Sequence, residues 1–302
     1  MGSPASNTRD MSAGHDHNAE NGRLKVAVAV TLGILAVEVA GGLLAHSLAL
    51  LTDAVHVLTD VAAAALALWA GIIAQRRPDE KRTFGYGRAT VLAALLNAVV
   101  LIVLTVYIIY EAVRRLAEPQ AVAPWIMIPA AAFAIVANVL LAFYLSHGGE
   151  RSMNVRAVIA HVAGDAFISG AVVVGAFLIL LTHLNIIDPI LSLLAAAVVV
   201  FSVWRIVKDA VNVLLEGAPS GVDPQAVKAD IERAVDVLGV HDLHVWSVSD
   251  GGCAASLHLR VDRASLARSP DVVKEVKQIL HDRFGVTHAT VEVECDDCEA
   301  SC

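Results

Sequence analysis

The chain has 302 residues, of which 57% are hydrophobic, 17% are charged and 5% are aromatic. Soluble domains carry about 25% charged residues, so this composition excludes an ordinary soluble protein. The formal net charge of −8 and the mean hydropathy of +0.65 also exclude a disordered chain and a nucleic-acid-binding chain, because both need more charge and the second needs a basic balance. We therefore expect a protein of the lipid bilayer without a nucleic-acid partner.

Long apolar blocks predict six membrane-spanning helices, since a helix needs about 20 mostly apolar residues to cross about 30 Å of hydrocarbon. Three blocks contain no Asp, Glu, Lys or Arg, and they cover residues 89–110, 119–149 and 166–187. Blocks 24–47 and 49–75 are interrupted by Glu38, Asp53 and Asp60, and a sixth block covers 187–208. The polar leader has no small-residue cleavage site, so we expect the first helix to be retained.

Lysine and arginine in the connections predict the orientation of these helices, because they concentrate on the cytoplasmic side. The link after the second block holds five of them, and the link after the fourth holds Arg151 and Arg156. The opposite face holds only Arg114 and Arg115. Both termini should therefore be cytoplasmic, and the Ala- and Val-rich composition with compact loops favours a bacterial inner membrane.

From Asp209 onward the composition changes and predicts a small cytoplasmic α+β domain of ferredoxin-like type. Residues 209–302 hold 17 acidic and 8 basic side chains, whereas residues 1–208 hold 13 and 14. The pattern gives a helix at 223–237, strands at 241–250 and 253–262, a helix at 269–284 and a strand at 287–294. A domain this small has a limited core, so we expect it to pair with a second copy in a homodimer. The predicted organisation is a leader at 1–23, a six-helix membrane domain at 24–208, a linker at 209–222 and the cytoplasmic domain at 223–302.

Two H-x-x-x-D motifs carry the strongest functional signal. His56 and Asp60 lie four residues apart in the second predicted span, and His161 and Asp165 repeat this spacing in the fifth. The spacing puts both side chains of a pair on one helix face, and ionisable groups in a bilayer usually face the bundle interior and mark functional sites. Two imidazoles and two carboxylates suffice for a four-coordinate Zn²⁺ site. Each pair could instead only form hydrogen bonds, but the repetition favours a metal site.

The ligand types narrow the choice of metal and suggest what drives its transport. Imidazole suits Zn²⁺, whereas Mg²⁺, Ca²⁺ and Mn²⁺ prefer oxygen ligands. The spans hold no cysteine that would favour Cu(I), so we expect zinc, with Co²⁺ or Cd²⁺ as alternatives. Metal binding needs neutral histidine, so protons compete with metal at His56 and His161. The motifs therefore predict a metal/proton antiporter with alternating access, an idea that transport indifferent to a pH gradient would refute.

Four segments together resemble the cation diffusion facilitator family, in its zinc or cobalt-zinc-cadmium efflux branch: EVAGGLLAHSLALLTDAVHVLTDVAAAALAL, HVAGDAFISG, IIDPILSLLAAAVV and HDLHVWSVS. The resemblance covers about Leu24 to Glu294. It implies a homodimer that exports divalent cations from the cytosol in exchange for protons, with the two H-x-x-x-D pairs as its transport site. It also implies a metallochaperone-like tail domain that binds further zinc. Asp53 is assigned to the outer access route, with a hydrogen bond to a neighbouring helix end as the alternative, and Glu38 is interpreted as a packing or hydration residue.

The cytoplasmic region holds further candidate metal ligands. His241, His258 and Glu292 match positions that the family uses for regulatory zinc, although they could be ordinary surface side chains. Cys295 and Cys298 form a C-x-x-C pair, which is half of a common zinc set. By resemblance to some vesicular zinc transporters, the leader histidines could complete an S₂N₂ site, and these are His15 and His17. The alternative is a tail with exposed thiols.

Two other functional classes compete with transport. An intramembrane metalloprotease also places His and Asp in its spans, but the chain has no H-E-x-x-H motif and no general-base glutamate beside either pair. We therefore do not expect an enzyme. A membrane-bound zinc sensor would use the same ligands without moving ions. Metal loss from preloaded vesicles, compared between wild type and Asp165→Ala, separates a transporter from a sensor.

Overall fold

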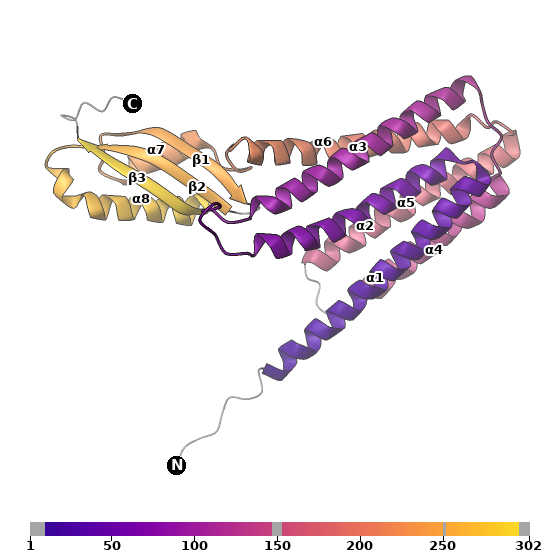
Figure 1. Cartoon of the computed structure of the whole chain (residues 1–302), viewed down its shortest axis with the longest axis horizontal. Helices are drawn as coiled ribbons and strands as arrows, with labels where there is room; N and C mark the ends of the chain where they lie inside the picture. Colours follow the sequence, from indigo (N-terminus) through magenta and orange to yellow (C-terminus); the bar gives the residue numbers. More distant parts are fainter. Residues whose placement is uncertain (1–9, 147–152, 250–251, 296–302) are drawn as a thin grey trace, which may run out of the picture. The chain divides into compact units, whose positions relative to one another are not determined.

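The computed structural model describes residues 10–146, 153–249 and 252–295, and the side chains of residues 26–146, 159–248 and 252–295. Its elements follow the chain in this order (Figure 1): α1 Asp10–Ala45, α2 Leu48–Ala74, α3 Arg88–Ala117, α4 Pro124–Ser146, α5 Met153–Thr182, α6 Ile187–Leu214, α7 Pro224–Ala234, β1 Gly239–Ser249, β2 Gly252–Val261, the 3₁₀ turn η1 Ser265–Arg268, α8 Ser269–Phe284 and β3 Val286–Cys295. The residues form two compact units, one of Met1–Ala64 and Val99–Val203 and one of Ala65–Ala98 and Trp204–Cys302.

Six helices among the described residues are long and apolar enough to cross a membrane, as the sequence predicts. Their spans are Val26–Ala45, Leu48–Ala74, Arg88–Ala117, Pro124–Ser146, Ile159–Thr182 and Ile187–Leu214. Only 17% to 33% of the residues in each apolar window are buried, and large side chains such as Leu68, Phe167 and Phe201 are exposed. A soluble protein rarely exposes apolar surface on this scale, so the helices present an exterior suited to acyl chains.

Four helices extend well beyond the apolar blocks counted in the sequence. Helix α1 begins at Asp10, inside the region expected to be a leader. Helix α3 continues to Ala117 because Glu111 forms an ion pair with Arg115, one turn further on, at 3.0 Å. Helix α5 begins at Met153, so both residues of its H-x-x-x-D motif lie well inside a helix. Helix α6 runs to Leu214, into the region expected to be a linker. Block counting stops at the first charged side chain, whereas a helix tolerates charges near its ends.

An acid from α6 fixes the start of α2. The fully buried carboxylate of Asp188 accepts hydrogen bonds from the Ser47 hydroxyl at 2.5 Å and from the backbone amides of Leu48 and Ala49 at 2.8 and 3.2 Å. The first amides of a helix lack partners within that helix, and an anion at this end is favourable. Asp188 therefore holds the beginning of α2, two turns before its H-x-x-x-D motif, against α6.

Helices α1, α4 and α5 of the first unit pack through small side chains. Helix α4 lies against both α1 and α5 (Figure 1), and one buried cluster includes Ala45, Met127, Ala131 and Ala176. A Cβ atom added at Gly41 of α1 would lie 2.7 Å from the Cβ of Ala130 in α4. Small residues allow this close approach, which is the usual way in which membrane helices associate.

The cytoplasmic domain has the predicted α+β composition. Strands β1 and β2 pair antiparallel, β2 and β3 pair parallel, and the sheet order is β1-β2-β3. Helix α7 begins with Asp223, whose side chain accepts a hydrogen bond from the Gln225 amide at 3.0 Å, and α8 ends at Gly285 with a φ of 67°. Both ends follow the expected capping chemistry.

Both helices of this domain cover the same face of the sheet. Ile231 of α7 and Val276 of α8 share one buried cluster with Val245, Leu257 and Leu259 of the strands. Side chains alternate along a strand, so the neighbours of these strand residues point to the other face, which these two helices leave uncovered. That open face carries the histidines and acids of the sheet.

Candidate metal centre

The two H-x-x-x-D motifs meet inside the first unit, as the sequence predicts for a shared site. The Nε2 atom of His161 lies 3.2 Å from the Asp60 carboxylate and 3.8 Å from that of Asp165. The Nε2 atom of His56 lies 3.7 Å from Asp60 and 3.8 Å from Asp165. The two imidazole rings are 6.2 Å apart between centroids. Each carboxylate therefore contacts the imidazoles of both helices.

These distances fit a tetrahedral metal ion. Ligand atoms at about 2.0–2.1 Å from a tetrahedral Zn²⁺ are separated from each other by roughly 3.3 Å. The four nitrogen–oxygen separations, 3.2–3.8 Å, lie at or slightly above this value. Direct hydrogen bonds would be closer to 2.8 Å. The donor set of two imidazoles and two carboxylates suits Zn²⁺ and similar cations better than Mg²⁺ or Ca²⁺.

We call these four side chains the four-residue centre (His56, Asp60, His161 and Asp165). They are polar groups surrounded mostly by apolar side chains. A cavity of about 410 Å³ is lined by three of them together with Asp53 and with apolar residues of α6. The exposed fraction of these side chains ranges from 13% for Asp165 to 50% for His161. An ion at this point is partly shielded but has an open side, which a site that both takes up and releases its ligand requires.

Two further acids of the spans, Glu38 and Asp53, are not members of this centre, although Asp53 lines the same cavity. Glu38 and Asp53 are almost fully buried, as is Asn138 of α4. The sequence interpretation of Glu38 as a packing residue and of Asp53 as a residue of the access route gives no reason for them to meet, yet their carboxyl groups interact directly.

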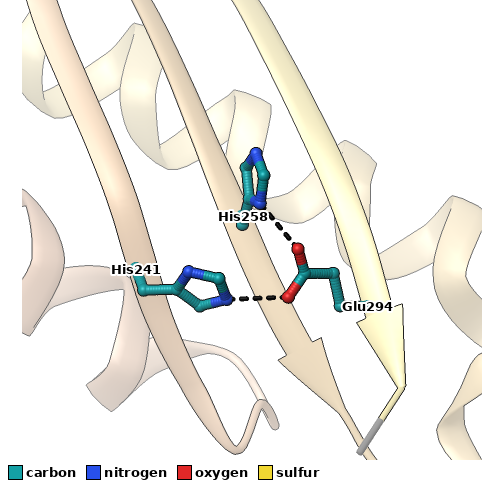
Figure 2. Close-up of side chains that lie close together, drawn as sticks. All are labelled: His241, His258 and Glu294. Carbon is teal, nitrogen blue, oxygen red and sulfur yellow. Dashed lines mark hydrogen bonds and ion pairs between the residues drawn. The ribbon is translucent and has the colours of Figure 1, made fainter. Parts of the chain in front are cut away.

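A second group of metal-binding side chains lies on the open face of the cytoplasmic sheet (Figure 2). The Nε2 atom of His241 is 2.8 Å from one carboxylate oxygen of Glu294, and the Nδ1 atom of His258 is 2.6 Å from the other. Strand register explains the group, because His241 stands opposite His258, and His258 stands opposite Glu292, two residues before Glu294. The hydrogen bond from His258 is the main reason why the pKa of Glu294 lies below its usual value. The carboxylate is therefore ionised at neutral pH.

The other nitrogen of His258 faces two further acids. Its Nε2 atom lies 3.5 Å from Asp242 and 3.6 Å from Glu292. Asp242 has a φ of 48° at an irregularity in the pairing of β1, and such a bulge redirects a side chain. The Asp242 carboxylate also accepts a hydrogen bond from His244 at 2.9 Å, which lowers its pKa. The sequence analysis assigned Glu292 to this site, and the structure adds Glu294. Residues two apart in a strand lie on the same face, so strand alternation could have indicated Glu294 as well.

The proposed thiol site is mostly outside the described side chains. Cys295 is the last residue of β3, where it pairs with Val261 and is half-buried and free. Cys298 lies outside the described residues, and the side chains of His15 and His17 lie outside those that the structure describes. Their relation to Cys295 stays a prediction.

Comparison with known proteins identifies the family. The sequence profile of the cation efflux transmembrane domain matches residues 24–215, and that of the cation efflux protein cytoplasmic domain matches residues 219–296. The chain belongs to the cation efflux family. The resemblance found in the sequence is thus confirmed, and this family consists of metal efflux transporters rather than enzymes.

Named relatives of this cation efflux protein align over almost its full length. The metal cation efflux system protein CzcD of Cupriavidus metallidurans is 38% identical over 292 residues, which cover 96% of this chain and 92% of CzcD. The zinc transporter ZitB of Escherichia coli is 40% identical and covers 94% of this chain and 90% of its own. The cadmium, cobalt and zinc/H(+)-K(+) antiporter of Bacillus velezensis is 34% identical, with 93% and 92% covered. The chain is therefore an integral membrane protein for metal cation efflux.

Proposed function

We propose that this cation efflux protein exports Zn²⁺ from the cytosol through the four-residue centre in exchange for protons. The observation that carries the proposal is the meeting of two H-x-x-x-D pairs from α2 and α5, with nitrogen–oxygen separations of 3.2–3.8 Å. Zinc is the preferred candidate substrate because the site has imidazole donors and because relatives are named for zinc. One of these names also includes cobalt and cadmium. Co²⁺ and Cd²⁺ are the alternative substrates.

Proton coupling follows from the chemistry of the ligands. A histidine that binds metal must be neutral, so a proton on either imidazole of the centre opposes the cation. Each imidazole also lies 3.2–3.8 Å from the carboxylates of Asp60 and Asp165. Exchange across the membrane then requires alternating access, in which the centre faces one side with metal and the other with protons. The name of the Bacillus relative, which includes H⁺, agrees with this scheme.

The membrane placement and the assembly are part of the same proposal. The link between α2 and α3 carries a cluster of basic residues, namely Arg76, Arg77, Lys81, Arg82 and Arg88, and this cluster supports a cytoplasmic position for the link and for both termini. The small cytoplasmic domain pairs with that of a second copy, which gives a homodimer in a bacterial inner membrane. In this proposal the membrane domain covers residues 24–208 and the dimerising domain covers residues 223–302. The linker at 209–222 lies between them, and α6 continues into it as far as Leu214.

We also propose that the cytoplasmic sheet binds a regulatory zinc ion through His241 and His258. The 3.5–3.6 Å separations around Nε2 of His258 suit a shared ion with Asp242 and Glu292, while Glu294 orients both imidazoles by hydrogen bonds. A second zinc would join Cys295 and Cys298 to His15 and His17. Loss of one zinc per chain in a Cys295→Ser, Cys298→Ser variant tests the thiol site, and an unchanged zinc content would refute it.

One assay tests transport itself against the sensor alternative. Purified full-length protein is placed in vesicles loaded with Zn²⁺, and metal release is followed with and without an imposed pH gradient. We expect release by the wild type, faster with an inward proton gradient where protons exchange for zinc, and no release by Asp165→Ala. Zinc binding without release would identify a sensor, and release that ignores the gradient would refute proton coupling.

A further inference from the structure

The buried acid of α6 does more than the start of α2 requires. The Ser47 hydroxyl already accepts a hydrogen bond from the Leu50 amide at 3.2 Å, which is the usual way to cap a helix from within its own sequence. Asp188 is nevertheless fully buried against the same turn, where it accepts bonds from the Ser47 hydroxyl and from the Leu48 and Ala49 amides. Burying a carboxylate is costly even when it is hydrogen-bonded, so its place there calls for a role beyond the local cap.

The turn between α1 and α2 is also bound by two further elements. The Arg115 guanidinium of α3 donates a hydrogen bond to the His46 carbonyl, and the Ala123 amide, just before α4, donates one to the Ala45 carbonyl at 3.0 Å. His46 has a φ of 54°, a left-handed conformation that persists in such a residue where the surrounding structure holds it. With Asp188 of α6, three neighbours therefore fix this turn within the first unit.

The fixed turn lies close to the four-residue centre along two helices. In α2, His56 follows Leu48 by about two turns, or about 12 Å. In α6, Ala195 follows Asp188 by about two turns and lines the cavity that contains His56. Helix α2 belongs to the first unit only as far as Ala64. The Asp188 carboxylate thus joins the helix that carries two of the metal ligands to a helix that lines their cavity.

The metal site tolerates little movement of α2. Its ligands come from two helices, and the separations that cross between them are 3.2 Å from Asp60 to His161 and 3.8 Å from His56 to Asp165. Metal–ligand distances are fixed to within about 0.2 Å. A shift of α2 by about 1 Å, which is enough to impair an active site, moves both of its ligands beyond this tolerance relative to α5.

We propose that Asp188 is a positioning residue of the transport site: its carboxylate sets where α2 begins against α6, and thereby where His56 and Asp60 lie relative to the ligands of α5. The inference rests on the proposed transport function. Asp188 is not a member of the four-residue centre, so it acts through the position of α2. A purely structural role would lower the stability of the protein and leave the zinc affinity of the folded protein unchanged.

Zinc affinity and the cobalt spectrum of the full-length protein test this role. The protein is studied in detergent micelles, with the proposed cytoplasmic sites removed by His241→Ala, His258→Ala, Cys295→Ser and Cys298→Ser. We expect Asp188→Ala to weaken zinc binding about tenfold, the lower end of what loss of a ligand-orienting contact costs. Co²⁺ bound in place of zinc should lose the intense visible absorption of a tetrahedral site. Asp188→Asn keeps the shape and one acceptor oxygen, so it should restore most of the affinity and stay within about threefold of the reference.

Two serine variants separate the tie between helices from packing within α6. The Ser192 hydroxyl is buried one turn after Asp188 and donates a hydrogen bond to the Asp188 carbonyl at 2.9 Å, within the same helix. Ser192→Ala should therefore leave the zinc affinity and the cobalt spectrum unchanged. Ser47→Ala removes one donor to the Asp188 carboxylate and should weaken zinc binding about threefold. This milder change decides the question if the Asp188→Ala protein does not fold.

The outcomes distinguish the positioning role from the transport site itself. If Asp60→Asn weakens zinc binding while Asp188→Ala leaves both affinity and spectrum unchanged, Asp188 does not position the site and the four-residue centre stands. An effect of Ser192→Ala as large as that of Asp188→Ala would also overturn the positioning role, because it would show a general response to lost packing. If Asp60→Asn has no effect on zinc affinity, the four-residue centre fails and the positioning role fails with it.

Discussion

Replacing Asp60 by asparagine tests the shared ligand set most simply. The Asp60 carboxylate lies 3.2 Å from Nε2 of His161 and 3.7 Å from Nε2 of His56, so it faces imidazoles from both helices. Asparagine has the same shape but no charge, and its amide is a poor zinc ligand. The change removes one ligand and one negative charge and leaves the packing of α2 as it is.

The expected loss follows from the number of ligands. A transport site must release its ion, so a dissociation constant near micromolar, about 8 kcal/mol of binding free energy, is a reasonable reference. Four ligands that share this energy contribute about 2 kcal/mol each, which corresponds to a loss of about 30-fold in affinity when one ligand is removed. The lost negative charge weakens zinc binding further, so about 30-fold is a lower bound on the loss of affinity.

Isothermal titration of zinc into the full-length protein measures this loss. The proposed cytoplasmic sites are removed in both proteins by His241→Ala, His258→Ala, Cys295→Ser and Cys298→Ser, so that the signal comes from the spans. Glu111→Gln serves as the matched control, because it also converts a partly buried acid of the spans to its amide. A dissociation constant for Asp60→Asn within about threefold of the reference protein would show that Asp60 is not a ligand and would refute the shared site.

Three further outcomes are expected. His56→Asp exchanges a nitrogen donor for oxygen, so in competition binding it should shift the preference from Zn²⁺ toward Mn²⁺ by about tenfold, and an unchanged ratio would argue against His56 as a ligand. Gly41→Ala should lower the free energy of unfolding by about 1–3 kcal/mol in thermal melts, because the new methyl group meets Ala130. Gly33→Ala serves as the control and should not lower it, because open space surrounds Gly33. Equal melting temperatures of the two variants would contradict the close approach of α1 and α4. Glu294→Gln should destabilise the metal-free protein at neutral pH. The stabilisation by a carboxylate of lowered pKa is complete above its ordinary value of 4.5 and is lost as the pH falls through the lowered pKa of Glu294, so this difference should shrink with acidification. A difference that does not change as the pH is lowered would contradict the role of its charge.

The architecture of the chain could largely be predicted from its sequence. Length and hydropathy determine the six helices, because a helix that crosses a bilayer has few alternatives in length or composition. Alternation and capping gave the strands and helices of the cytoplasmic domain. Helix ends were predicted less well: α3 and α6 continue past their first charges because ion pairs and solvent accommodate these side chains.

The sites could be predicted only as far as local spacing reaches. Four-residue spacing places His56 and Asp60 on one face, but only the packing of α2 and α5 decides that a second pair meets them. The contact of Glu38 with Asp53 also depends on helix packing, because the sequence of α1 does not indicate that it packs against α2. In the sheet, strand register decided the partner of His258, and sequence alone gave no sign of the bulge at Asp242.

An anomalous difference map at the zinc absorption edge, from crystals of the full-length protein grown with ZnCl₂, tests the central claim most directly. The claim predicts a peak between α2 and α5, about 2.0–2.2 Å from a nitrogen of His56 and of His161 and from an oxygen of Asp60 and of Asp165. A map with zinc peaks in the cytoplasmic domain but none between these four side chains, at a zinc concentration that supports transport, would contradict it.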